Sequence, residues 1–259
     1  MGERTKYTPG TFSWTDLTTT DQDAAKAFYE GLFGWTAVEM PAGEGIVYSM
    51  MQLHGKDVAA ISPQPQQQRD AGAPPVWNSY ITVESADAAL GRAEQLGGTV
   101  HAPAFDVFEA GRMGVIQDPH GAYVLVWEPK NHIGAGLVNA HGALAWNELA
   151  TPDMNASADF YRELFGWTVE PVEGMAMPYM TIKNNEGWNN GGIRPAQPGE
   201  PTYWLIYLGT DDIDASLAKV AELGGRQLVD TLHIGVGKLA IVQDGQGAVF
   251  ALYSGQFET

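Results

Sequence analysis

Apolar residues recur every three or four positions along two similar stretches of the chain, which is the period of an α-helix with one buried face. In the first stretch Phe28 and Leu32 lie on one such face, and the pattern F-Y-x-x-L-F-G-W closes it. The same pattern returns 132 residues later, because Phe28 corresponds to Phe160 (160 − 28). We therefore predict helices at residues 21–33 and 153–165 and an internal duplication of the chain.

Around these helices, short extended stretches bounded by Gly, Pro and Asn indicate strands and turns. The order strand, helix, three strands occurs four times. The expected strands are residues 11–17, 35–39, 46–53, 57–62, 76–83, 99–107, 112–117, 122–128, 143–149, 167–170, 179–183, 190–194, 202–209, 226–232, 237–243 and 248–254, and the two further helices are residues 86–96 and 212–223. The pattern predicts an α+β protein built from four βαβββ modules.

The four modules group into two halves of similar length. Residues 1–10 are expected to be a polar N-terminal arm, residues 11–129 a first domain, residues 130–142 a glycine-containing linker and residues 143–259 a second domain. Residues 64–75, which are rich in Pro and Gln, are expected to be a surface connection between two modules.

The amino-acid composition excludes several kinds of active site and disfavours some classes of binding partner. The 259 residues are 44% apolar, which is enough for ordinary cores, and include no cysteine, which excludes thiol nucleophiles, thiolate metal sites and disulfides. A formal net charge of −17 disfavours nucleic acid and anionic membranes, and no stretch approaches the roughly 20 apolar residues that span a bilayer. The N-terminus also lacks the apolar segment of a signal peptide. We expect a cytoplasmic monomer or homodimer that binds a small molecule.

Several short motifs carry a resemblance to a known family: Asp16-Leu17, Phe28-Tyr29, Leu32-Phe33-Gly34, Gly97-Gly98 and Asp118-Pro119-His120-Gly121. With them the chain resembles the vicinal oxygen chelate superfamily, which contains glyoxalase I, extradiol dioxygenases and bleomycin-resistance proteins. The segment from His132 to Leu149 resembles its two-domain actinobacterial branch. The resemblance implies the glyoxalase/bleomycin resistance fold, in which two βαβββ modules pair into a cup-shaped mixed sheet, here twice. In the metal-dependent members, His or Gln on first strands and Glu on last strands bind one divalent ion.

The positions that match those metal ligands hold residues that are unsuited to binding a divalent ion. They are Trp14, Asn78, residues 59–61 and Leu125 in the first half, and Trp146, residues 191–193, Leu205 and Ala251 in the second. None is His, Asp or Glu, and an amide alone is a poor anchor for a divalent ion. We therefore expect neither a metal site nor another cofactor.

Strand alternation places a set of mostly aromatic side chains inside the cups. They are Phe12, Trp14, Asp16, Asn78, Tyr80, Tyr123, Leu125 and Trp127 in the first half, and Leu144, Trp146, Glu148, Tyr203, Leu205, Tyr207, Val249, Ala251 and Tyr253 in the second. Aromatic walls with a few polar groups are typical of a pocket for a planar apolar ligand. The same rings could instead fill the cups. Asp16 or Glu148 could serve as a general base, or could pair with Arg112 and Lys238.

The functional hypothesis is a metal-free protein that binds or sequesters a hydrophobic aromatic compound, such as an antibiotic or a pathway intermediate. No catalytic residue is assigned, because the six histidines lie in turns, in the linker or singly on strands, and no nucleophile or phosphate-loop motif occurs. The alternatives are a glyoxalase-like lyase, a cofactor-free isomerase or oxygenase that uses Asp16 or Glu148 as its base, and a purely structural protein with filled cups.

Overall fold

The computed structural model describes residues 2–43, 45–175 and 177–257, so that the first residue of the expected arm and the last two of the second half lie outside it. The first half contains β1 (Gly2–Glu3), β2 (Phe12–Thr19), α1 (Gln22–Phe33), β3 (Thr36–Pro41), β4 (Val47–Leu53), β5 (Lys56–Pro63), α2 (Gln66–Asp70), β6 (Val76–Thr82), α3 (Ala86–Gln95), β7 (Thr99–Val107), β8 (Gly111–Gln117) and β9 (Tyr123–Pro129).

The second half repeats this order, again beginning with a short strand, but without a counterpart of α2. It contains β10 (Leu137–Val138), β11 (Leu144–Thr151), α4 (Met154–Phe165), β12 (Thr168–Pro171), β13 (Met180–Lys183), β14 (Asn189–Pro195), β15 (Tyr203–Gly209), α5 (Ile213–Glu222), β16 (Arg226–Ile234), β17 (Gly237–Gln243) and β18 (Val249–Gly255). The four predicted modules are present. Their longer helices begin at the caps that the sequence offers, Asp21 and Asp153, and end at Gly34 and Gly166 in the left-handed conformation.

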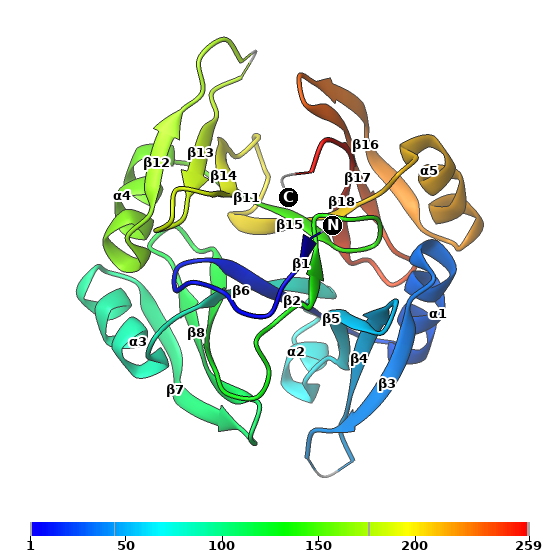
Figure 1. Ribbon diagram of the computed structural model, residues 1–259, viewed down its shortest axis with the longest axis horizontal. Coiled ribbons are helices and arrows are strands. Elements are labelled where there is room, and N and C mark those ends of the chain that lie inside the picture. The colour runs from blue at the N-terminus through cyan, green and yellow to red at the C-terminus, as the bar shows by residue number, and fades with distance from the viewer. Residues whose placement is uncertain (1, 44, 176, 258–259) are drawn as a thin grey trace.

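Two mixed sheets form the framework of the molecule. The first has the strand order β3-β4-β5-β2-β6-β9-β8-β7, and the second has β12-β13-β14-β11-β15-β18-β17-β16. In each sheet an antiparallel pair of central strands, β2 with β6 and β11 with β15, joins two modules. The sheets curve into two cups that open in opposite directions, downward for the first half and upward for the second in Figure 1.

The convex faces of the two sheets meet in the middle of the molecule. Ser79 on β6 donates a hydrogen bond of 2.7 Å to Asn147 on β11, across this interface. Since neighbouring residues of a strand point to opposite faces, Asn78 and Tyr80 point into the first cup, and Glu148 points into the second. The interface therefore fixes which side chains can reach a ligand.

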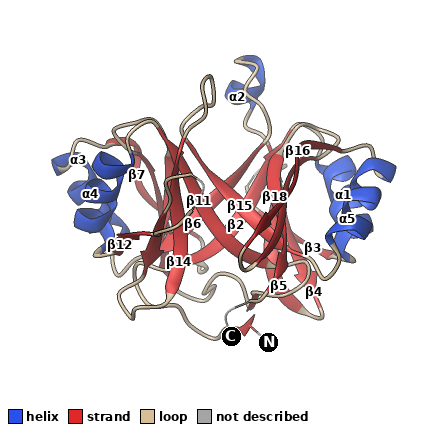
Figure 2. Cartoon of the chain, turned by 90° about the horizontal axis from the view of Figure 1, so that it is seen from above, coloured by secondary structure: helices blue, strands red, loops and turns tan. Residues whose placement is uncertain are grey.

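The helices flank the sheets in pairs drawn from different halves. Helix α1 packs against α5 on one flank, and α3 lies beside α4 on the other (Figure 2). Gly31 of α1 allows the close approach, because a Cβ atom there would lie 2.8 Å from the Leu223 side chain. Phe28 and Phe250, which belong to different halves, share one buried cluster. The two halves are therefore joined by a common core.

Two equivalent hydrogen bonds cross between the halves inside that core. The Tyr29 hydroxyl donates to Asp244 Oδ2 at 3.1 Å, and the Tyr161 hydroxyl donates to Asp118 Oδ2 at 3.0 Å. Each tyrosine belongs to the F-Y motif of one half, and each aspartate opens the tight turn before the last strand of the other. The F-Y motif of each half thus contacts the aspartate turn of the other half across the interface.

Three segments outside the predicted modules, namely the N-terminal arm, the linker and residues 64–75, contain short strands or a helix that the sequence pattern did not predict. Strand β1 in the arm pairs with β10 in the linker, β10 pairs with β11, and α2 lies within residues 64–75. Two-residue strands and one-turn helices carry too few residues for a period to be recognised. None of the described helices is long and apolar enough to cross a membrane.

Candidate functional site

A buried carboxylate lies at the centre of the first cup, surrounded by uncharged donors. Asp16 on β2 accepts hydrogen bonds from Asn78 Nδ2 at 2.8 Å, from the Tyr80 hydroxyl at 2.7 Å and from the Tyr48 hydroxyl at 3.0 Å. Trp14 Nε1 donates to the Tyr48 oxygen at 3.0 Å. Strands β2, β4 and β6 position these side chains, and the result is a Trp-Tyr-carboxylate-Tyr network.

The environment of this network shifts its protonation equilibria. Asp16 is only 5% exposed, and burial raises its pKa above the ordinary value, while the hydrogen bonds from Asn78, Tyr80 and Tyr48 oppose the shift. Burial, together with the nearby Asp16 charge, raises the pKa of Tyr48 and Tyr80 well above 10. The two phenols therefore remain protonated donors, and the carboxyl is the group in this network that can take up a proton.

The second cup holds a matching network. Trp146 Nε1 donates to the Tyr179 hydroxyl at 3.0 Å, and the hydroxyls of Tyr179 and Tyr207 interact with the carboxylate of Glu148. Burial, followed by the Glu148 charge, raises the pKa of both tyrosines well above 10. The order Trp-Tyr-carboxylate-Tyr is the same as in the first half.

A cation completes the second network. Arg194 on β14 donates to Glu148 at 2.8 Å and forms a bidentate pair with Glu200, at 2.7 and 2.6 Å. Glu200 also accepts a hydrogen bond from the Tyr203 hydroxyl at 3.1 Å. Arg194 thus ties the β14–β15 connection to the carboxylate inside the cup. Neither Arg194 nor the two tyrosines Tyr48 and Tyr179 was identified from the sequence.

The two networks occupy the region where the resemblance would put a metal ion. Asp16 pairs across the sheet with Ala60, and Glu148 pairs with Gly192, so the matching ligand positions on β5 and β14 carry no ligand side chain. The Tyr179 ring lies directly over Gly192, where an added Cβ would come within 2.0 Å of its hydroxyl. Among the residues described, no three His, Asp or Glu side chains cluster in a way that could hold an ion. These residues do not fit the family's divalent ion.

The linker closes the first cup with an imidazole that the sequence pattern did not single out. The ring of His132 lies edge-to-face on Trp14, with centroids 4.7 Å apart, and near Trp127 at 5.9 Å. Trp127 Nε1 donates to the His132 carbonyl oxygen at 2.8 Å. Burial lowers the pKa of His132, while Asp57 acts in the opposite direction. Its Nε2 atom is buried and has no hydrogen-bond partner.

Most of the predicted lining residues gather in the cups. Trp14, Asp16, Asn78, Tyr80, Leu125 and Trp127 come together in the first. In the second, Leu205, Tyr207 and Ala251 form a separate apolar cluster against Trp146, Tyr203, Val249 and Tyr253. The Tyr253 hydroxyl is 3.0 Å from the Val236 carbonyl oxygen, so its polar end contacts the main chain.

Three predicted lining residues lie elsewhere. Phe12 packs on Trp167 and Trp204 of the other half, with centroids 5.4 and 4.9 Å apart, because a bulge between Phe12 and Trp14 reverses the alternation. An equivalent bulge after Leu144 turns that side chain into the core shared by the halves. Tyr123 is 48% exposed at the end of β9.

The ion pairs suggested for the two carboxylates are wrong. Arg112 pairs with Asp87 at 2.8 Å, and Lys238 lies 3.6 Å from Asp214. Both acids lie in the first turns of α3 and α5, which follow the central strands. The sequence offered no spacing rule that would favour Arg194 over Lys238, since the contact depends on how β14 pairs with β11.

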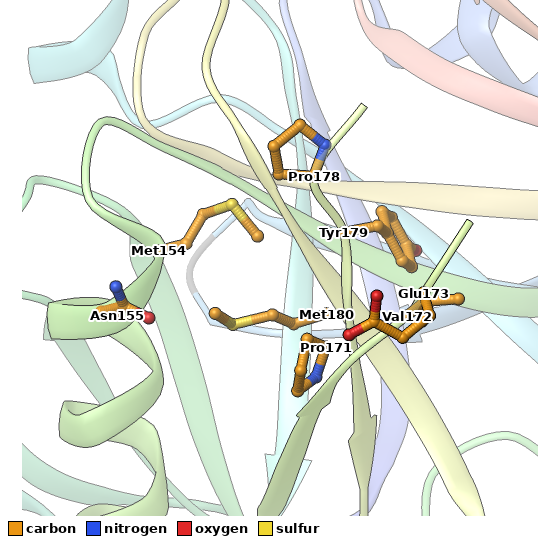
Figure 3. Close-up of a pocket in the computed structure, with 8 residues that line it drawn as sticks. All are labelled: Met154, Asn155, Pro171, Val172, Glu173, Pro178, Tyr179 and Met180. Atoms are coloured by element: carbon orange, nitrogen blue, oxygen red, sulfur yellow. The ribbon is translucent and has the colours of Figure 1, made fainter. Parts of the chain in front are cut away.

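A surface pocket lies beside the second cup (Figure 3). It has a volume of about 310 Å³ and is lined by Met154, Asn155, Pro171, Val172, Glu173, Pro178, Tyr179 and Met180. Tyr179 is shared with the second network, so the ring that contacts Glu148 also forms one wall of this pocket. A second pocket of about 430 Å³ lies between α3 and β7.

Comparison with known proteins places these features in context. The model of the Glyoxalase/Bleomycin resistance protein/Dioxygenase superfamily matches residues 11–126 and 142–252. "Putative glyoxylase CFP32" of Mycobacterium tuberculosis is 44% identical over 97% of both chains, and "Anthracycline biosynthesis protein DauV" of Streptomyces sp. is 31% identical over 96% of this chain and 94% of its own.

Solved structures support the same fold. The Mn(II)-bound glyoxalase from Novosphingobium aromaticivorans superposes with a TM-score of 0.65 at 14% identity, covering 98% of this chain and 83% of that one. The 2,3-dioxygenase LapB from Pseudomonas sp. KL28 gives a TM-score of 0.63 at 12% identity, covering 96% and 93%. At these identities the likeness concerns the fold alone.

Proposed function

Since this chain belongs to the Glyoxalase/Bleomycin resistance protein/Dioxygenase superfamily, we propose that it uses the cup-shaped sheets of that fold to bind a planar, largely apolar aromatic molecule without a metal ion. The observation that carries the proposal is the Trp-Tyr-carboxylate-Tyr network, which is present in both cups where coordinating residues are missing. The protein would then carry or sequester its ligand in the cytoplasm.

The walls of the cups have the chemistry that such a ligand requires. Indole and phenol rings offer large flat faces, and the few polar groups can orient a bound molecule. In the first cup, Met50 and Met113 are half-buried against the same cluster, and unbranched side chains of this kind adapt to a ligand's shape. One relative is named for the biosynthesis of anthracyclines, which are fused-ring aromatic compounds. Its name agrees with the proposal of a planar aromatic ligand.

Tryptophan fluorescence tests the proposal. Titration with soluble planar polycyclic compounds, such as anthraquinone sulfonates and acridines, is expected to quench emission in a saturable way, equally before and after treatment with EDTA. Trp14→Phe or Trp146→Phe should reduce the quenching according to the cup that is occupied. Trp188→Phe is the matched control, because Trp188 is 60% exposed and lies outside both networks. Absence of binding across the set, or one tightly bound divalent ion per chain in elemental analysis, would contradict the proposal.

One observation favours a second candidate function, a proton transfer catalysed without a cofactor. Asp16 is buried, its pKa is raised, and no cationic partner among the described residues neutralises it, which suits a general base. Glu148 suits this role less well, because Arg194 pairs with it. If a turned-over substrate is found, Asp16→Asn should abolish turnover while binding persists; unchanged turnover would remove Asp16 from this role.

A further inference from the structure

The two cups differ in whether the central carboxylate has a cationic partner. Glu148 in the second cup lies 2.8 Å from Arg194, whose side chain is 12% exposed. Asp16 in the first cup is equally buried, yet its partners are Asn78, Tyr80 and Tyr48, all of them uncharged. Within the described part of the chain, no Lys, Arg or His forms an ion pair with Asp16.

Strand register explains the difference. Glu148 pairs with Gly192, and two residues further along the same strands Ala150 pairs with Arg194. In the first half, Asp16 pairs with Ala60 and Thr18 pairs with Ser62. Ser62 therefore occupies the place of Arg194, and its short side chain lies 3.4 Å from the Leu17 carbonyl oxygen. The first half has the same scaffold without the cation.

A group that lacks a hydrogen-bond partner lies beside the residues of the same cup. His132 Nδ1 lies 3.9 Å from the Asp57 carboxylate, and a proton on Nδ1 would leave Nε2 as an acceptor. That Nε2 atom is buried without a partner, while the ring lies against Trp14. A buried acceptor without a donor costs free energy that a bound molecule can recover. The first cup thus contains a carboxylate without a counter-ion near an imidazole nitrogen without a hydrogen-bond partner.

We propose that the first cup selects a planar aromatic cation, one that carries an ammonium or a protonated or quaternised ring nitrogen, whereas the second cup, in which Arg194 already pairs with Glu148, does not. This inference rests on the proposed function and adds the charge of the ligand. A buried carboxylate without a counter-ion is costly, and a cationic ligand supplies the missing charge. The faces of Trp14 and Trp127 also attract a cation held against them.

A pair of planar probes that differ by one N-methyl group and its positive charge provides the test. N-Methylacridinium is a permanent planar cation, and acridine at pH 8 is its neutral parent. Fluorescence titration of the full-length chain is expected to give at least about tenfold tighter binding for the cation, which is modest for a partly screened charge pair at contact distance. Trp14→Phe should reduce the signal if the cation occupies the first cup.

Three variants test whether the cation binds at Asp16 or is attracted by the overall negative charge of the protein. Asp16→Asn should lose most of the preference for N-methylacridinium and keep its affinity for acridine, which also reports that the variant is folded. Asp230→Asn removes the same unit of charge from the exposed strand β16 and should change neither affinity. Ser62→Arg supplies the cation present in the other half and should likewise remove the preference.

The outcomes distinguish this inference from the function on which it rests. Equal affinity for both probes, or an unchanged preference in Asp16→Asn, would overturn the charge selection and leave aromatic binding intact. A loss of preference in Asp230→Asn as large as in Asp16→Asn would also overturn it, because nonspecific attraction would then account for the effect. Failure of both probes to bind the wild-type chain would overturn the proposed function together with the inference.

Discussion

At the scale of single residues, the crossed tyrosine-aspartate pairs link the two halves by buried hydrogen bonds. Tyr29 donates to Asp244 and accepts from Trp77 Nε1 at 2.9 Å, so that one hydroxyl satisfies two buried groups. Tyr161 does the same with Asp118 and with Trp204 Nε1 at 3.0 Å. Unsatisfied buried donors and acceptors are costly, which makes these hydroxyls sensitive positions.

We expect Tyr29→Phe to lower the free energy of unfolding by about 1–3 kcal/mol, because Trp77 Nε1 loses its acceptor and Asp244 loses a donor. Tyr161→Phe should have an effect of similar size. Urea denaturation followed by circular dichroism measures both. Tyr123→Phe, at a position 48% exposed, is the control and should fall within about 0.5 kcal/mol of wild type. An effect of Tyr29→Phe no larger than that of the control would contradict the argument.

The sequence alone identifies the carboxylates of the cups but not all of their hydrogen-bond partners. Asp16 and Glu148 were recognised because they stand on central strands with an alternating pattern. Tyr48 and Tyr179 were missed, although they follow those carboxylates by similar distances, 32 residues (48 − 16) and 31 residues (179 − 148). Aligning the halves with a shift of one residue would have paired them, because their separation is 131 residues (179 − 48) and the helices are 132 apart. Phe12 could not have been assigned correctly, since a bulge reverses a face without a recognisable sequence signal.

At the scale of elements, the long helices and strands followed from periodicity, whereas the short connections did not. The arm is the clearest case. The Gly10 carbonyl oxygen accepts hydrogen bonds from Trp167 Nε1 at 2.5 Å and Asn190 Nδ2 at 3.0 Å, both from the second half. The Tyr7 hydroxyl donates to the Ala135 carbonyl oxygen at 2.6 Å. A segment that appears polar in the sequence is thus part of the interface between the halves.

Removal of residues 1–10 is therefore expected to destabilise the protein by on the order of 3 kcal/mol, because several buried partners lose their hydrogen bonds together. Removal of residues 1–5 serves as the comparison, since Tyr7 and Gly10 then remain. Differential scanning calorimetry should record a clearly lower Tm for the longer deletion. Identical melting curves for the two deletions would show that the arm contributes little beyond β1.

At the scale of the whole molecule, the free energy of unfolding should depend on pH through the titration of the buried carboxyl in the first cup. Burial raises the pKa of Asp16 in the folded state above its unfolded value of about 4. The folded state therefore binds this proton more tightly, so the contribution of Asp16 is fully present below about pH 4 and is lost as the pH rises through the raised pKa.

Asp16→Asn removes this titration, so its stability relative to wild type should improve from about pH 4 until the pH has passed the raised folded-state pKa. At low pH, where the wild-type carboxyl is protonated, the two proteins should be most alike in the charge of this site. Urea denaturation at intervals between pH 4 and 8 gives the difference in free energy of unfolding directly. A difference that is flat, or that falls with rising pH, would show that Asp16 is not penalised by its burial.

The crossed pairing of Tyr29 with Asp244 and of Tyr161 with Asp118 also bears on ancestry. Each half contains both partners of the pair, a tyrosine on its first long helix and an aspartate before its last strand, but neither half joins its own two. An ancestral polypeptide of half this length would have met the same requirement as a symmetric homodimer, each copy supplying the tyrosine for its twin. Within one chain the two halves are free to differ, as they do where Arg194 in one cup corresponds to Ser62 in the other.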